Sequence, residues 1–127
     1  MKGVKNSIDQ EKIQALIDLS QETGENLLES LINMFVYKFD LKMEFISKNL
    51  EIRNMEEIAK TAHTMKSSCA YLGINSYSEL FQLMQENVHK DPEHTEAIIQ
   101  QIKQSYPEIK KELLQIKAKN SGIEKFK

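Results

Sequence analysis

Residues 62–73 read Ala-His-Thr-Met-Lys-Ser-Ser-Cys-Ala-Tyr-Leu-Gly and belong to a strongly periodic segment. Apolar residues recur there at intervals of three and four, which is the spacing of one face of an α-helix. They are Met55, Ile58, Ala62, Met65, Cys69 and Leu72. His63 directly follows Ala62, which belongs to this stripe, so His63 points about 100° away from the predicted core. The segment therefore predicts a helix that buries one side and presents His63 to solvent.

The same spacing recurs on both sides of this segment. It predicts a short helix from Asp9 to Ser20, a long helix from Glu25 to Glu51, a fourth helix after Gly73 and a last helix after Asp91. The residues predicted to face inward are Ile13, Leu16 and Ile17; Leu28, Leu31, Ile32, Phe35, Phe39, Met43, Ile46 and Leu50; Tyr77, Leu80, Phe81, Met84 and Val88; Ile99, Ile102, Tyr106, Ile109, Leu113 and Ile116.

Two pairs of residues have the spacing of a helix-starting capping box. Asn54 is followed three residues later by Glu57, and Ser76 by Glu79. We expect Asn54 to cap the helix that bears His63 and Ser76 to cap the next one.

Glycine and proline mark the remaining boundaries. Gly24 separates the first two helices, and Gly73 suits a left-handed C-cap. Asp91-Pro92 has the pattern of an N-cap followed by proline at the first helical position. Pro107 lies inside the last helix, where it removes a backbone donor and should cause a kink.

Length and composition favour one all-α domain. The chain has 127 residues, is 40% hydrophobic and 28% charged, and contains only 4 Gly and 2 Pro. Short connections between long amphipathic helices predict an antiparallel up-and-down four-helix bundle with a short extra N-terminal helix. We assign residues 8–118 to the bundle, with a flexible N-terminus at 1–7 and a polar C-terminal tail at 119–127.

Charge and cysteine content restrict the partners. The net charge of −2 gives no reason to expect nucleic acid or an anionic membrane. The one cysteine, Cys69, lies on the apolar stripe and is predicted to be a buried hydrophobe. No apolar run reaches the roughly 20 residues of a membrane-spanning helix, and no signal peptide is evident, so a cytoplasmic location is expected.

His63 and its neighbours have the chemistry of a phosphoryl carrier. A neutral imidazole nitrogen is nucleophilic and can attack the acyl phosphate of an aspartate. Lys66 follows by three residues, on the same side of the helix, and can neutralise phosphate oxygens. Ser67 can add a hydroxyl contact, and small Ala59 and Ala70 leave room for a partner's active site. The sequence has no glycine-rich phosphate loop and no magnesium-binding carboxylate cluster.

These residues resemble the histidine-containing phosphotransfer (HPt) domains of multistep two-component signalling. The family motif has the form His-x-x-Lys-Gly-Ser-Ser followed by a Gly. Here it corresponds to His63-Thr64-Met65-Lys66-Ser67-Ser68-Cys69 and then Leu72-Gly73. Ala62 and the preceding apolar helix with Phe35 and Phe39 are also typical, so the resemblance covers roughly residues 8–117.

The resemblance implies a role for each motif residue. His63 would be the phospho-acceptor, Lys66 would stabilise the phosphate and Gly73 would be structural, whereas Ala59, Thr64 and Ala70 would dock the partner. The implied partners are response regulator receiver domains and a hybrid sensor histidine kinase. The carrier would be a monomeric non-enzyme without cofactor or metal of its own, and Mg²⁺ would belong to the receiver. Ser67 departs from the family's frequent Gly, and we expect docking to survive this change. Ile74 departs from the family's frequent Ala and is interpreted as a packing variation at the helix end.

Two other functions are compatible with parts of the sequence. A transfer-inactive bundle could bind receiver domains as a scaffold or inhibitor, although the intact His63–Lys66 pair argues against this. The other is a catalytic role, as a dimerising histidine kinase fragment or a phosphohistidine phosphatase. The kinase would need an ATP-binding domain and different residues after the histidine. A metal site at His89 and His94 is disfavoured, because no cysteine or third histidine is in reach.

Overall fold

In the computed structural model, residues 8–120 are described, and this range is all-helical without a strand. The predictions for residues 1–7 and for the tail beyond Asn120 lie outside the described residues. The five helices are α1 (Gln10–Thr23), α2 (Leu27–Glu51), α3 (Met55–Tyr71), α4 (Asn75–Asn87) and α5 (Pro92–Lys119). None of the described helices is both long enough and apolar enough to cross a membrane.

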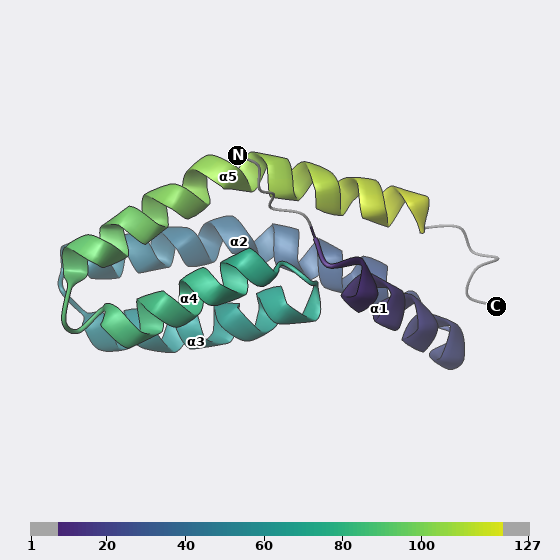
Figure 1. Cartoon of the computed structure of the whole chain (residues 1–127), viewed down its shortest axis with the longest axis horizontal. Helices are drawn as coiled ribbons and strands as arrows, with labels where there is room; N and C mark the ends of the chain where they lie inside the picture. Colours follow the sequence, from purple (N-terminus) through teal and green to yellow (C-terminus); the bar gives the residue numbers. More distant parts are fainter. Residues whose placement is uncertain (1–7, 121–127) are drawn as a thin grey trace.

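The four helices α2 to α5 form a closed ring, in which each packs against two others. α2 packs against α3 and α5, and α4 packs against the same two helices. α1 packs against α2 and lies at the end of the molecule where α3 turns into α4 (Figure 1). α5 is continuous through Pro107 and changes direction near its middle, which agrees with the predicted kink (Figure 1).

The predicted apolar stripes form one core. All their residues are buried except four that are half-buried against the same cluster, namely Ile17, Leu31, Met55 and Leu80. An aromatic group lies inside this core: the ring of Phe39 stacks on Tyr106 at 4.0 Å and on Tyr77 at 6.0 Å between centroids. The Tyr77 hydroxyl donates to the carbonyl of Ile102 at 3.2 Å, which ties α4 to α5.

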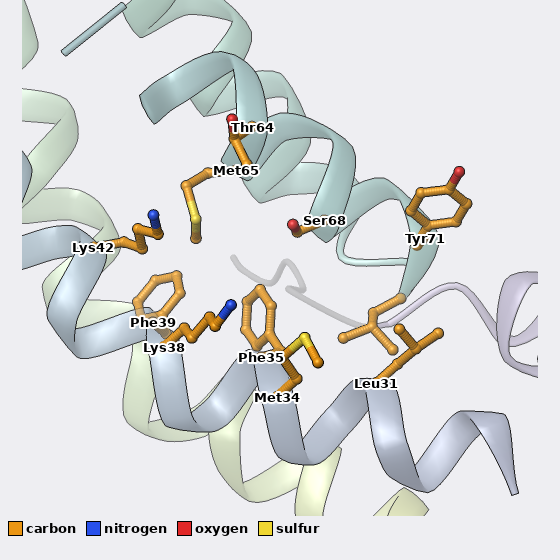
Figure 2. A pocket seen from close by; sticks show the side chains of 11 residues that line it. Leu31, Met34, Phe35, Lys38, Phe39, Lys42, Thr64, Met65, Ser68 and Tyr71 are labelled. Carbon is orange, nitrogen blue, oxygen red and sulfur yellow. The ribbon is translucent and has the colours of Figure 1, made fainter. Parts of the chain in front are cut away.

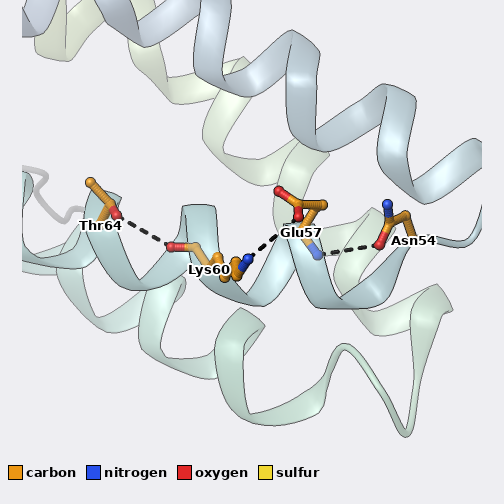
Figure 3. Close-up of polar contacts among 4 residues, drawn as sticks. All are labelled: Asn54, Glu57, Lys60 and Thr64. Carbon is orange, nitrogen blue, oxygen red and sulfur yellow. Dashed lines mark hydrogen bonds and ion pairs between the residues drawn. The ribbon is translucent and has the colours of Figure 1, made fainter.

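Most predicted helix ends are confirmed. The Asn54 side chain accepts from the backbone N–H of Glu57, and Asp91 caps α5 with Pro92 in its first turn. Gly24 and Gly73 have φ values of +80° and +74°. Along the outer surface of α3, Glu57 pairs with Lys60, and Thr64 donates to the Lys60 carbonyl (Figure 3).

The predicted start of α4 was wrong. Ser76 does not cap it: the helix begins at Asn75, its N-cap is Ile74, and no side chain bonds to the cap. The reason is that the turn from α3 is held by burial of Leu72 and Ile74, and the Ile74 N–H already bonds to the Cys69 carbonyl at 2.9 Å.

Two further boundaries shift by a few residues. Asp9 caps α1 from outside the helix instead of lying in its first turn, and α1 continues beyond Ser20 to Thr23. α2 begins at Leu27 instead of Glu25, because the side chain of Asn26 accepts from the Glu29 N–H and sets the start.

The first described residues bind across the end of the molecule. The Asp9 N–H donates to the Gly73 carbonyl at 2.8 Å, and the Asp9 carboxylate accepts from Asn75 at 3.1 Å. The Ile8 N–H donates to the Glu112 carboxylate at 3.1 Å. A Cβ added at Gly73 would lie 2.8 Å from the Asp9 carbonyl oxygen. Gly73 therefore serves both the left-handed turn and the close approach of Asp9.

Candidate functional site

His63 lies on the exposed side of α3, as the sequence predicted, and its ring contacts α4. Its Nδ1 atom is 3.3 Å from the side-chain amide nitrogen of Gln85. The neighbouring inward positions Ala62 and Met65 are buried, so the backbone under the imidazole is fixed by packing. The other ring nitrogen, Nε2, has no hydrogen bond to any residue of the described range.

The contact with Gln85 couples the tautomer of His63 to the orientation of the Gln85 carboxamide. If its amide nitrogen faces Nδ1, then Nδ1 accepts and a neutral ring has its proton on Nε2. A half-turn of the carboxamide brings its oxygen to Nδ1, which then donates and leaves a lone pair on Nε2. The Gln85 oxygen is buried without a hydrogen-bond partner in the first orientation. Only the second orientation makes Nε2 nucleophilic.

Lys66 also faces α4. Its ammonium donates to the Gln82 side-chain oxygen at 2.7 Å, and the Gln82 amide nitrogen donates to the carboxylate of Glu86. The Lys66 carbonyl accepts from the Ser78 hydroxyl at 3.1 Å. Lys66 is thus held beside α4 by a neutral oxygen, which an anion near His63 can replace, because charge-assisted hydrogen bonds are the stronger ones.

No hydrogen bond of the described residues joins the other predicted residues to the imidazole. The side chain of Ser67 is exposed and forms no hydrogen bond with the described chain. Ala59 is half-buried against the core, and the carbonyl of half-buried Ala70 accepts from Lys12 of α1 at 3.2 Å. Thr64 is exposed and faces the α2 side of α3, where it helps to line a groove (Figure 2).

Sequence reasoning missed Gln82 and Gln85. Gln82 lies 16 residues from Lys66 along the chain, and Gln85 lies 22 residues from His63, so both belong to a different helix. Their spacing of three was a usable signal, because it puts both amides on one face of α4. The stripe Phe81, Met84 and Val88 turns inward and leaves Gln82 and Gln85 at its edge.

Cys69 is not a reactive group of this site. Its side chain is fully buried on the inward side of α3, and burial raises the pKa of its thiol to about 12. The thiolate, which is the reactive form, is therefore absent at neutral pH. Within the described range, no group of three or more His, Cys, Asp or Glu side chains could hold a metal ion.

Comparison with known proteins identifies the family of the chain. The model of the Hpt domain family matches residues 13–118, and the chain therefore belongs to that family. This confirms the resemblance seen in the sequence. The chain is also similar to the phosphorelay intermediate protein YPD1 of Candida albicans, with 32% identity over 69 residues. That match covers 54% of this chain and 38% of the yeast protein. No solved structure gives a significant match.

Proposed function

We propose that this protein is a histidine phosphotransfer protein of a phosphorelay. His63 accepts a phosphoryl group from a receiver-domain aspartate or a hybrid histidine kinase, and passes it to the aspartate of another response regulator. The observation that carries the proposal is the exposed His63 ring, whose Nδ1 is bound by Gln85 while Nε2 stays open. Family membership and the similarity to a phosphorelay intermediate support it.

The transfer step is a nucleophilic displacement at phosphorus. The Nε2 lone pair attacks the acyl phosphate, the N–P bond forms, and the P–O bond to the aspartate breaks with its electron pair leaving on the carboxylate. With the Gln85 carboxamide in the second orientation, Nδ1 keeps its proton and donates it to the Gln85 oxygen, which stabilises the positive charge of the phosphorylated ring. Lys66 leaves the Gln82 oxygen and binds the phosphate. Transfer onward is the reverse reaction with a second aspartate.

The setting of this carrier follows from the same proposal. It is a monomeric non-enzyme in the cytoplasm with no ATP site or cofactor, and Mg²⁺ and the acidic residues belong to the receiver. Its scaffold is an antiparallel up-and-down bundle of α2 to α5, with α1 at one end. In it Ala59, Thr64 and Ala70 border the docking surface around His63, Ser67 lies beside the phosphate, and Gly73 keeps a structural role.

The test is phosphotransfer from phosphorylated receiver domains of the same organism to wild type and to His63→Gln. We expect acid-labile phosphate, detected by intact mass, on wild type alone. Labelling of His63→Gln to the wild-type level would overturn the proposal. If receivers bind both proteins equally and neither is labelled, the chain is a transfer-inactive scaffold instead.

A further inference from the structure

An apolar groove lies between α2 and α3 (Figure 2). Phe35 forms part of its floor, and Thr64 and Ser68 line it from α3. Thr64 directly follows His63 in the chain. Because Gln82 and Gln85 occupy the α4 side, a partner that reaches Nε2 has open surface on the α2 side.

The size and rim of the groove fit a protein partner better than a small molecule. Its cavity is about 200 Å³, whereas sites for drug-sized ligands enclose roughly 300–1,000 Å³. Met34 is 54% exposed and Tyr71 is 68% exposed at its edge. Methionine and tyrosine are enriched in protein interfaces, where they give adaptable or rigid contact area. A row of a few side chains from a partner helix would fill this space.

Two lysines give the groove a definite charge. Lys38 and Lys42 lie one turn apart on α2 along one edge (Figure 2). Neither ammonium has a hydrogen bond or ion pair in the described chain, and no residue lining the groove is acidic. Asp40, between them in sequence, lies toward α5, where its charge acts on Tyr106. This positive edge stands out in a chain with a net charge of −2.

We propose that Lys38 and Lys42, at the edge of this groove, select which receiver domains exchange phosphate with His63, favouring those whose docking helix carries carboxylates beside its apolar ridge. This inference rests on the proposed function. Like charges placed opposite each other suppress wrong partners, and complementary charges raise the rate of association. The lysines thus determine which receiver exchanges phosphate with His63 without touching the phosphate.

The test compares Lys38→Glu/Lys42→Glu with Lys110→Glu/Lys111→Glu, which makes the same change in charge on α5. Receivers that label wild type are used as donors over a range of salt concentrations. The first variant should transfer at least about tenfold more slowly at low salt, with a smaller difference at high salt. The α5 control should stay near wild type. Labelling of His63 by phosphoramidate, a small donor that needs no docking, should be equal in all three proteins. Equal far-UV circular dichroism and urea midpoints would show that each is folded.

A reciprocal exchange then identifies the occupant. Replacing the carboxylates of the receiver's docking helix by lysine should restore transfer to Lys38→Glu/Lys42→Glu. Equal loss in both double variants, or no loss in the first, would overturn the inference and leave the carrier role standing. Sedimentation showing a dimer that only Lys38→Glu/Lys42→Glu dissolves would assign the groove to a second copy. If no receiver labels wild type, the proposed function fails and the inference fails with it.

Discussion

The packed and exposed sides of α3 make opposite kinds of contact over the same helix. On the packed side, Ile58, Ala62 and Cys69 are completely buried. Just beyond the end of the helix, the Asp9 N–H donates to the Gly73 carbonyl. On the exposed side, the side chains of His63 and Lys66 each have one hydrogen-bonding neighbour among the described residues, both on α4. Rigid packing positions the backbone, and sparse contacts leave the imidazole and ammonium able to exchange partners. Substitutions on the two sides should therefore affect different measurements.

The largest effect on stability is expected at the closed end of the packed side. Gly73→Ala places a Cβ at φ +74° and 2.8 Å from the Asp9 carbonyl oxygen. We expect a loss of about 2–4 kcal/mol in the free energy of unfolding, measured by urea denaturation. Phosphoramidate labelling per folded molecule should not change.

Gly24→Ala is the matched control, because this exposed glycine also has a positive φ, of 80°. It should lose only about 1 kcal/mol, the usual cost of a side chain in this conformation. Equal losses at the two positions would show that the close approach of Asp9 adds nothing to the cost of a side chain at position 73.

The packed side was predictable from sequence and much of the exposed side was not. Periodic apolar residues identified the core, and Asn54 and Asp91 identified two helix starts, because both signals are local. Ser76 was misjudged because the start of α4 depends on burial of Ile74, which a local capping pattern does not report.

The contacts of His63 and Lys66 depend on how α3 and α4 pack. In the sequence, Gln82 and Gln85 have only the pattern of exposed polar residues of a helix. The packing of α4 against α3 places them beside Lys66 and His63. The groove likewise needs α2 beside α3, so Lys38 and Lys42 gave no separate signal in the sequence.

The next effect is on the exposed side, at Gln85. Gln85→Leu removes the group that holds Nδ1, so we expect transfer to slow by about tenfold, or about 1.4 kcal/mol in the barrier. Gln85→Glu should retain transfer, because a carboxylate only accepts and so keeps the proton on Nδ1. Single-turnover transfer gives the rates, and nitrogen NMR of the His63 ring gives the tautomer.

Gln100→Leu on α5 serves as the control, since this exposed side chain bonds only to Glu96. It should change neither the rate nor the His63 tautomer. If Gln85→Leu leaves the tautomer as in wild type, Gln85 does not select the nucleophilic nitrogen.

The smallest effect at neutral pH is expected at Cys69, on the packed side. Cys69→Ala leaves a small cavity and should cost about 1 kcal/mol, with transfer unchanged. Its dependence on pH is more informative. Burial raises the pKa of the thiol from 9.0 to about 12, so the folded state holds this proton more tightly than the unfolded state. The contribution of the protonated thiol to the free energy of unfolding is complete below pH 9 and is lost as pH rises from 9 toward 12.

Wild type should therefore begin to lose stability above pH 9 in urea titrations. In Cys69→Ala the loss should begin nearer pH 10, the ordinary pKa of tyrosine, because burial raises the pKa of Tyr77 from 10.0 to about 12. Coincident pH profiles for the two proteins would mean that the thiol ionises as freely in the folded chain as in the unfolded one. The packed side of α3 would then be open to water at Cys69, and the contrast with the exposed side would not hold there.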